Sequence, residues 1–494
     1  MRKVIIKQSF SPYLYESNGE LGDYATLSHC WGQKQVITTT KATFKLRKRG
    51  IAWNELSKTF QDALVITEKL GLRYLWIDSL CIIQDDLWDW EIESKKMAEI
   101  YKGSMLTIAA AKARNGEDGC FANGRESKKI TPSRPYSNKP FEVWYKEWPE
   151  HFEFTFPGKR SAKLGLDLFD RAWTLQEELL AQRVLYYTEA EVVWQCKTLI
   201  DCSCGRIAQD LAQGGKRPIK LAYEETIRNG LKGDTMIYLW AKILTKYTSR
   251  KLTKQTDRFP ALSGLAKLFQ TRGLGDYVAG LWTKQLPLWL TWCLDYNIRP
   301  SPQDSFTAPS WSWGSITNGD EITFRALDLL EISPTANLQV KLEIKHVSCE
   351  LASSDVTGAV KSGLLVTTGP TVGGICGYYW TIDHRENFYC VKRDGAEVCI
   401  RHDRGDELMM NLAGQTVYCL LTCVIECEGS EYAFFIVLTL DDNSNTYRRI
   451  GLIGGEIVEE LSEDPWGSWV NPETKYKIPA RWLRSAEQRE FTIV

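Results

Sequence analysis

The residues that could do chemistry gather near the ends of two apolar runs. Ser28 and His29 end the run at 24–30, and Asp78 lies inside the run at 72–83. If both runs are parallel strands, their carboxyl ends lie where open α/β folds bind ligands. A carboxylate inside an apolar run must be paired, hydrogen-bonded or shifted in pKa, so Asp78 is a candidate for acid–base chemistry. Further candidate ligand-binding residues after these runs are Trp31, Gln84 and Asp85.

A second polar group lies at 170–180, in the sequence DRAWTLQEELL. Its candidate site residues are Arg171, Trp173, Gln176 and Glu177. Trp173 and Glu177 are four residues apart, so they share one face of a helix. A carboxylate beside an aromatic ring suits a cationic or ribosyl ligand. Glu178 would point about a quarter turn away, toward solvent.

Each of these residues also has a structural explanation. Asp78 could cap a helix or form a buried pair with Arg171, and His29 could be a buried histidine without a catalytic role. The helix that carries Glu177 could be an ordinary amphipathic helix with charged flanks. The residue types alone leave both explanations open.

A cysteine nucleophile is a further hypothesis. His29 cannot readily activate Cys30, because adjacent residues of one strand point to opposite faces. Pairing of His29 with Cys81 is geometrically possible if the two lie on neighbouring strands. Cys81 is therefore another candidate site residue.

The cysteines also raise the question of a metal. Cys196, Cys202 and Cys204 form the one close cluster, and the spacing of the last two is C-x-C. A structural zinc site would want a C-x2-C pair and a second ligand pair at a similar spacing. Because no histidine is nearby in the sequence, we expect no metal site.

Hydrophobic patterning predicts the elements that hold these groups. Continuous apolar runs at 24–30, 72–83 and 105–113 are typical of buried strands, and apolar residues recur at helical spacing in 53–71 and 85–104. Strands and helices therefore alternate, which predicts an α/β fold with a parallel sheet.

The rest of the chain predicts further kinds of structure. Residues 114–160 have the composition of a long surface excursion, and a helix at 168–183 and a β hairpin at 183–196 follow. Three amphipathic helices come next, the last at 277–294, and from 322 onward short β runs alternate with turns. The predicted domains are an α/β domain at 1–205, a helical subdomain packed on it at 206–320 and a β-rich module at 321–494.

Composition excludes several classes of protein. Hydrophobic residues make up 44% and charged residues 25% of the 494 residues, as in soluble globular proteins. The net charge of -1 gives no overall attraction to nucleic acid. No apolar run approaches the ~20 residues of a membrane span, and the N-terminus lacks the features of a signal peptide. We expect a cytoplasmic protein without a membrane span.

Common enzyme signatures are missing from the sequence. It has no G-x-S-x-G, no H-E-x-x-H and no P-loop. The run at 24–30 leads into Cys-Trp-Gly-Gln rather than the glycine-rich turn of a dinucleotide-binding fold. These absences exclude the commonest enzyme classes and leave the polar groups described above as the candidates for catalysis.

Several segments together resemble a known family. YATLSHCWG, LGLRYLWIDSLCIIQDD and DWEIESKKMAEIYKGSMLTIAAAKA resemble three successive blocks of the fungal heterokaryon incompatibility (HET) domain, and RAWTLQEELLAQRVLYY resembles the segment that closes it. DRFPALSGLAK, YVAGLW, PSWSWGSI and YRRIGL resemble regions that follow this domain in fungal HET proteins. The resemblance implies a parallel-sheet (TIR/flavodoxin-like) α/β domain and a role in fungal non-self recognition or regulated cell death.

The HET domain is in turn distantly similar to TIR domains, some of which cleave NAD. The sequence WTLQE at 173–177 resembles the W-C-x-x-E-L helix that carries the catalytic glutamate of such TIR domains, with Thr174 in place of the cysteine and Glu178 intruding before the leucine. The resemblance implies that Glu177 stabilises the oxocarbenium-like charge that develops when the nicotinamide–ribose bond breaks.

The same resemblance implies roles for the other candidates. Trp173 would stack on a ring of NAD, Arg171 would meet a phosphate, and Asp78 or His29 would bind ribose hydroxyls. NAD would be a substrate, and no cofactor is expected.

Two other functions remain open. The domain could be a non-catalytic module that signals through protein partners or self-association. It could also be a small-molecule group transferase of secondary metabolism built on the same scaffold, with His29 and Cys81 as its reactive pair.

Overall fold

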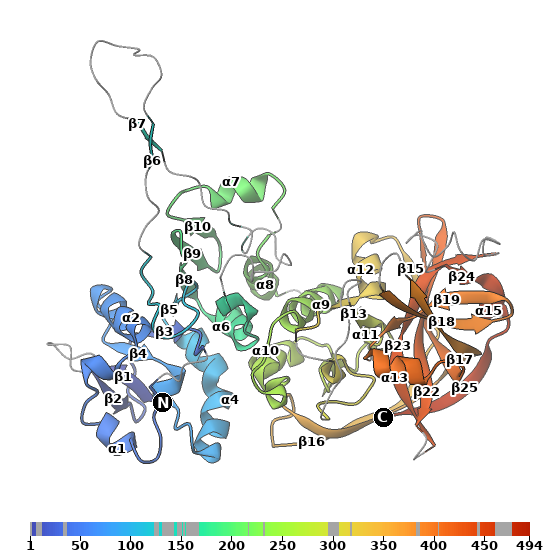
Figure 1. Cartoon of the computed structure of the whole chain (residues 1–494), viewed down its shortest axis with the longest axis horizontal. Coiled ribbons are helices and arrows are strands. Elements are labelled where there is room, and N and C mark those ends of the chain that lie inside the picture. Colours follow the sequence, from blue (N-terminus) through green and yellow to red (C-terminus); the bar gives the residue numbers. More distant parts are fainter. Residues whose placement is uncertain are drawn as a thin grey trace, which may run out of the picture. The chain divides into compact units, whose positions relative to one another are not determined.

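The chain forms two compact units, Met1–Gly230 and Leu231–Val494. The computed structural model (Figure 1) describes residues 2–5, 12–32, 37–122, 128–130, 143–145, 151, 154, 167–215, 217–230, 233–294, 306–316, 319–381, 386–403, 405–441, 445–459 and 477–494. The predicted surface excursion at 114–160 lies largely outside these residues. The three-domain division stays a prediction.

An eight-stranded sheet forms the centre of the first unit, in the order β10-β9-β8-β5-β3-β4-β1-β2. Its strands are β1 (Arg2–Ile5), β2 (Tyr13–Glu16), β3 (Tyr24–Ser28), β4 (Tyr74–Trp76), β5 (Leu106–Ala109), β8 (Arg183–Tyr187), β9 (Val192–Cys196) and β10 (Ile200–Cys202). The central strands β4, β3, β5 and β8 are parallel, and the outer strands pair antiparallel. The predicted α/β fold with parallel strands and the hairpin at 183–196 are confirmed. The narrower TIR/flavodoxin-like assignment stays a prediction.

Helices cover this sheet. They are α1 (Phe44–Arg47), η1 (Trp53–Glu55), α2 (Lys58–Lys69), α3 (Asp78–Cys81), α4 (Leu87–Gly103), η3 (Asp167–Asp170), α6 (Trp173–Leu180), α7 (Ile207–Ala212) and α8 (Ile219–Arg228), and β6 (Lys128–Ile130) pairs with β7 (Val143–Tyr145). The chain runs from β3 through α2 to β4, and then through α4 back past β3 to β5, so right-handed crossovers put α2 and α4 on opposite faces. Helix α6 contacts α4 (Figure 1), which brings the second polar group to the sheet.

The second apolar run does not form one long strand, as the sequence predicted. Strand β4 ends at Trp76, and Asp78 is the first residue of the short helix α3. Periodicity alone cannot distinguish a buried strand from a buried helical turn, since both are continuously apolar. This correction also moves Cys81 from a strand to the last position of α3.

The second unit is β-rich, as predicted. Strand β17 pairs with both β21 and β25, so the ring β17-β21-β22-β23-β25 closes on itself. The strands of the second unit are β11 (Tyr277–Val278), β12 (Leu281–Trp282), β13 (Trp292–Leu294), β14 (Ile322–Phe324), β15 (Asn337–Val340), β16 (Glu343–Leu351), β17 (Val360–Thr381), β18 (Glu386–Arg393), β19 (Ala396–Cys399), β20 (Arg401–His402), β21 (Thr416–Cys427), β22 (Ser430–Asp441), β23 (Thr446–Val458), β24 (Ile478–Pro479) and β25 (Glu487–Ile493). Its helices are α9 (Asp234–Thr248), η4 (Gln255–Asp257), α10 (Pro260–Gln270), α11 (Leu286–Trp289), η5 (Trp313–Ser315), α12 (Arg325–Ile332), α13 (Asp406–Asn411) and α15 (Ala480–Arg484).

The helix predicted at 277–294 is wrong. This segment forms the hairpin β11–β12, the short helix α11 and strand β13. Gly280 turns the hairpin with φ of +90°, and a Cβ at this position would lie 2.5 Å from the Trp313 indole nitrogen. The close approach of Trp313 therefore selects a glycine turn where the apolar pattern alone favours a helix.

Two further features concern the helices and the cysteines of the described residues. No helix among them is long and apolar enough to cross a membrane. All fourteen cysteines lie in described positions, and each is a free thiol.

Candidate functional site

The carboxyl group of Glu177 lies at the centre of a buried polar cluster. It hydrogen-bonds with the hydroxyls of Ser28, the last residue of β3, and Tyr101 on α4. Burial raises the pKa of Glu177 to about 7. The Asp78 charge also raises this pKa, whereas the Ser28 hydrogen bond and the Arg171 charge lower it. A carboxyl group with this pKa exchanges its proton near neutral pH, as a general acid or base must.

The Tyr101 hydroxyl gives this carboxyl group two satisfied states. Tyr101 donates to the Leu27 carbonyl over 3.2 Å and also hydrogen-bonds with Glu177. One hydroxyl carries one proton, so it cannot donate to both oxygens at once. When Glu177 is protonated, its own O–H can donate to the Tyr101 oxygen instead. The cluster can therefore hold Glu177 in either protonation state.

Asp78 links this cluster to solvent. Its side chain is 23% exposed, against 1% for that of His29. The Trp31 indole N–H donates to Asp78 Oδ2 over 3.0 Å, and the Ser79 backbone N–H donates to Oδ1 over 2.7 Å. These two donors fix the orientation of a carboxylate that solvent can still reach.

His29 is buried without a complete set of partners. Its Nε2 lies 3.8 Å from Asp78 Oδ1, beyond hydrogen-bond distance, and has no hydrogen-bond partner among the described residues. The ring packs edge-on against Phe60, with 5.0 Å between ring centres. Burial lowers the pKa of His29 to about 4, an effect that Asp78 opposes and Arg171 reinforces, so the imidazole is neutral at physiological pH.

Arg171 joins the two polar groups predicted from the sequence. Its guanidinium donates to the main-chain carbonyl of His29, which ties the segment before α6 to the end of β3. Its charge also opposes ionisation of His29 and favours that of Glu177. Arg171 therefore acts on both candidate titratable groups.

The end of helix α6 is held by a buried lysine. Lys220 on α8 is 0% exposed, and its Nζ donates to the carbonyls of Glu178 at 2.8 Å, Leu179 at 3.2 Å and Ala181. These are carbonyls that a helix leaves unpaired at its carboxyl end. The lysine therefore fixes the helix that presents Glu177.

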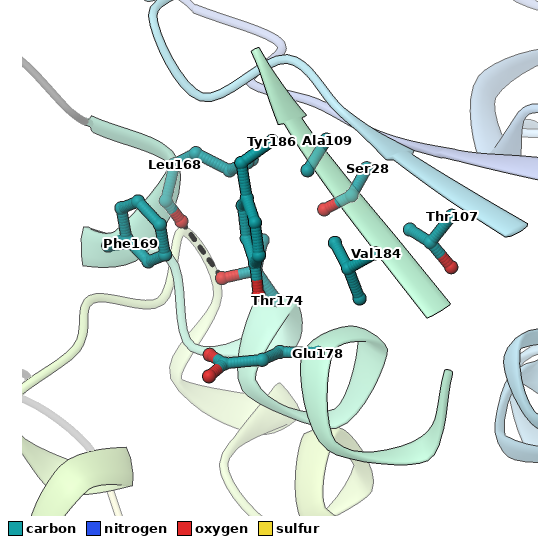
Figure 2. Close-up of a pocket in the computed structure, with 9 residues that line it drawn as sticks. All are labelled: Ser28, Thr107, Ala109, Leu168, Phe169, Thr174, Glu178, Val184 and Tyr186. Carbon is teal, nitrogen blue, oxygen red and sulfur yellow. Dashed lines mark hydrogen bonds between the residues drawn. The ribbon is translucent and has the colours of Figure 1, made fainter. Parts of the chain in front are cut away.

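A small cavity adjoins the cluster (Figure 2). Its volume is about 10 Å³, room for about one water molecule. It is lined by Ser28, Thr107, Ala109, Leu168, Phe169, Thr174, Glu178, Val184 and Tyr186. The expectation that Glu178 faces solvent is wrong, because the segment at η3 and strand β8 cover that side of α6 and leave Glu178 only 7% exposed.

Cys81 does not join the cluster in the way predicted. It lies on α3 rather than on a strand beside His29, and its carbonyl accepts a hydrogen bond of 2.9 Å from Arg2. Burial raises the pKa of the Cys81 thiol to about 12, so the nucleophilic thiolate is scarce at neutral pH.

Two further candidates have structural partners near the cluster. The Gln84 side-chain amide donates to the carbonyls of Asp78 and Ile82, over 3.2 and 3.1 Å. Asp85 Oδ1 accepts a hydrogen bond of 2.8 Å from the Lys41 backbone N–H. Both contacts shape the loop between α3 and α4. The ligand-binding roles predicted for these residues stay predictions.

Trp173 and Gln176 share helix α6 with Glu177, and Gln176 is buried. Their predicted roles in ligand binding stay predictions. Sequence reasoning missed Tyr101, which lies in the segment 85–104 that was predicted as a helix from its apolar spacing. The signal was present, since a tyrosine on a buried face needs a partner for its hydroxyl.

The fold and the cluster define an α/β domain with a buried titratable carboxyl group at the carboxyl ends of parallel strands. Residues 24–177 match the family described as Heterokaryon incompatibility protein (HET). No curated protein and no solved structure matches the chain. The matched range starts at the first residue of β3 and ends at Glu177. The chain therefore contains a HET domain, as the sequence motifs indicated.

Proposed function

We propose that this chain performs a heterokaryon incompatibility-type function in the cytoplasm by hydrolysing NAD at the nicotinamide–ribose bond. One observation carries the proposal. The Glu177 carboxyl group, with a pKa of about 7, lies between the hydroxyls of Ser28 and Tyr101, beside the end of a parallel strand. Buried carboxyls whose protonation is poised near neutral pH are characteristic of catalytic sites.

The proposed reaction requires a carboxylate and a water molecule. The bond between the ribose C1′ and the nicotinamide nitrogen breaks, and nicotinamide leaves with the electron pair. Ionised Glu177 stabilises the positive charge that develops on the ribose. Water then bonds to C1′ and gives up a proton to Glu177 and from there to solvent, which yields ADP-ribose.

Other residues would bind the substrate around this centre. Asp78, whose side chain is 23% exposed, would accept hydrogen bonds from ribose hydroxyls, and neutral His29 would adjoin it. Trp173 would stack on a ring, and Arg171 would meet a phosphate. Because the adjoining cavity holds about one water molecule, substrate entry requires α6 to move from the end of β3.

The test is nicotinamide release from NAD by the purified full-length chain. We expect the wild type to release nicotinamide and ADP-ribose in equal amounts, and Glu177→Gln to slow the release by about 100-fold or more. Glu93→Gln is the matched control, because Glu93 is an equally buried carboxyl on α4 that pairs with Lys96 at 3.0 Å. Release by Glu177→Gln at the wild-type rate, or none by the folded wild type, contradicts the proposal.

A second candidate is a non-catalytic module that acts through self-association or protein partners. The observation that favours it is the burial of the cluster, in which His29 is 2% and Glu177 is 7% exposed. Expression in fungal cells separates the two functions. A catalytic domain loses its effect on cell viability in Glu177→Gln, whereas a signalling module keeps it without consuming NAD.

The group transferase remains a hypothesis that the described geometry does not favour. Its reactive pair would need a Cys81 thiolate, and burial raises the pKa of that thiol to about 12.

A further inference from the structure

A second polar cluster lies in the first unit, around His151. Its Nε2 is 2.6 Å from Glu191 Oε1, and its Nδ1 is 2.6 Å from Asp210 Oδ2. The histidine is only 3% exposed. Because a carboxylate oxygen lies within hydrogen-bond distance of each ring nitrogen, the imidazole is held in one orientation.

Two thiols face the same imidazole. Cys204 Sγ lies 3.6 Å from His151 Nε2 and 3.2 Å from Cys202 Sγ. One ligand atom from each of His151, Glu191, Cys202 and Cys204 can be chosen so that all four lie within 4.8 Å of one another.

We propose that these four residues form a binding site for a structural zinc ion. The proposal is independent of the function proposed for Glu177, because none of its ligands belongs to that cluster. Sequence reasoning expected no metal because it sought a histidine close to the cysteines in the chain. His151 is 53 residues away from Cys204, and folding brings it to the C-x-C pair.

The spacing of these atoms is close to that of a tetrahedral site. Zinc bonds of about 2.0 Å to nitrogen or oxygen and about 2.3 Å to sulfur give tetrahedron edges of about 3.3 to 3.8 Å. The two sulfurs are 3.2 Å apart, and one sulfur is 3.6 Å from the imidazole nitrogen. Glu191 Oε1 is closer, at 2.6 Å from His151 Nε2, which is a hydrogen-bond distance, so the ion would take the place of this hydrogen bond. Small outward shifts of the side chains therefore admit the ion.

The hydrogen bonds around the ligands are those that a metal site needs. Asp210 accepts the Nδ1 proton of His151, which turns Nε2 toward the metal, as carboxylates do for zinc-bound histidines. Glu191 Oε2 is held by the Cys204 backbone N–H at 2.8 Å and by Ser203 Oγ at 3.1 Å, which leaves Oε1 for the ion.

The sulfur atoms accept hydrogen bonds from backbone N–H groups. The Ile207 N–H donates to Cys202 Sγ over 3.4 Å, and the Arg206 N–H donates to Cys204 Sγ. Gly205, with φ of +72°, makes the turn that aims these two N–H groups back at the sulfurs. These two N–H···S hydrogen bonds hold the sulfur atoms in place beside His151.

The choice of zinc and of a structural role follows from the ligand set. Two thiolates, an imidazole and a carboxylate are the donors that zinc takes in tetrahedral sites. Four protein ligands leave no open position for water or substrate, which distinguishes a structural from a catalytic zinc.

The site would fasten one turn of the chain to the sheet. The Phe154 N–H donates to the His151 carbonyl over 2.9 Å, and the Phe154 ring packs on Phe169 and Tyr186 at centre distances of 5.5 and 5.1 Å. Phe154 and Cys202 belong to one hydrophobic core cluster. Zinc would therefore hold this turn against the β9–β10 hairpin from the polar side, as Phe154 does from the apolar side.

The first experiment measures metal in the wild-type chain. Protein is purified under reducing conditions and dialysed against micromolar zinc. It should retain one equivalent of zinc per chain, as measured by elemental mass spectrometry. Cobalt in place of zinc should give the visible absorption of a tetrahedral ion and the near-ultraviolet band of thiolate-to-cobalt charge transfer. A chain that retains no metal, or octahedral cobalt without the thiolate band, overturns the proposal.

The second experiment assigns the ligands. His151→Ala and Cys204→Ser should each lower the retained zinc at least tenfold, whereas Cys196→Ser, a change to a nearby cysteine outside the four ligands, should retain it. Full zinc in either ligand variant overturns the assignment. Thiol counting in the wild type covers the case in which a variant fails to fold. Removal of zinc with a chelator should expose two further reactive thiols, and an unchanged thiol count contradicts the proposal.

Discussion

Each of the two units buries charged side chains, and the two sets are built differently. In the second unit, Arg449 and Asp403 are both fully buried and lie 2.7 Å apart. The Arg449 guanidinium also donates to the carbonyls of Leu290 and Trp292, and it stacks over the Trp292 ring at 3.7 Å. In the first unit, the Glu177 cluster brings a second carboxylate, a guanidinium and a neutral histidine around one carboxyl group.

The two sets of buried charges differ in how well their ionised forms are stabilised. The positive charge of Arg449 meets one carboxylate and two main-chain carbonyl oxygens, and such hydrogen bonds are what a stable buried ion pair requires. Glu177 has instead a pKa raised to about 7, and His29 Nε2 has no hydrogen-bond partner among the described residues. Buried groups held away from their usual ionisation state are candidates for a functional role.

The largest effect is expected at the Arg449 pair. Arg449→Met removes the partner of a buried carboxylate, so the free energy of unfolding should fall by about 3–5 kcal/mol. Chemical denaturation measures this loss. Arg448→Met is the control, because the adjacent Arg448 pairs with Asp441 at 2.8 Å with its side chain 61% exposed, where an ion pair contributes little. Equal losses in the two variants would remove the distinction drawn between the units.

A smaller effect concerns the pH dependence of stability. The pKa of Glu177 is about 7 in the folded chain, above its usual 4.5, so its ionisation lowers stability as the pH rises between these values. The stability of Glu177→Gln relative to wild type should therefore increase over this window, on the order of 1–3 kcal/mol. Denaturation at a series of pH values measures the change.

His29 provides the opposite slope in nearly the same window. Its pKa of about 4 lies below the usual 6.5, so wild-type stability gains from His29 as the pH rises between these values. His29→Gln should lose this gain, and its stability relative to wild type should fall with rising pH. If the stabilities of Glu177→Gln and His29→Gln relative to wild type change with pH in the same direction, the opposite pKa shifts of the two groups are contradicted.

The smallest effect tests the Tyr101 hydrogen bond. This contact lowers the pKa of Glu177, so Tyr101→Phe should raise the midpoint of the Glu177 titration by about half a unit to one unit. Carbon-13 NMR of the glutamate carboxyls measures that midpoint. Tyr24→Phe is the matched control, because the Tyr24 hydroxyl donates to the Ile100 carbonyl over 2.7 Å. An unmoved midpoint in Tyr101→Phe rules out the assigned contact.

Much of the first unit could be predicted from local pattern. The sequence around β3, α2, α4 and β5 has the periodicity of its element, and the predicted order of strands and helices holds there. The proximity of Ser28 and Asp78 followed from the rule that ligand sites lie at the carboxyl ends of parallel strands, whereas the packing of α6 against α4 brought Glu177 to them. The pattern was insufficient at Asp78, where a buried helical turn and a strand are equally apolar.

Local sequence was sufficient to predict most elements of the first unit, the HET motifs and the residue types available for chemistry, because each depends on neighbours a few positions away. Tertiary structure decided the partner of Tyr101, the burial of Glu178 and the meeting of His151 with Cys204. The residues of each pair lie far apart in the sequence, and Glu178 is covered by other segments of the chain. Burial and hydrogen bonding at such positions depend on how the elements pack, which spacing along the chain does not encode.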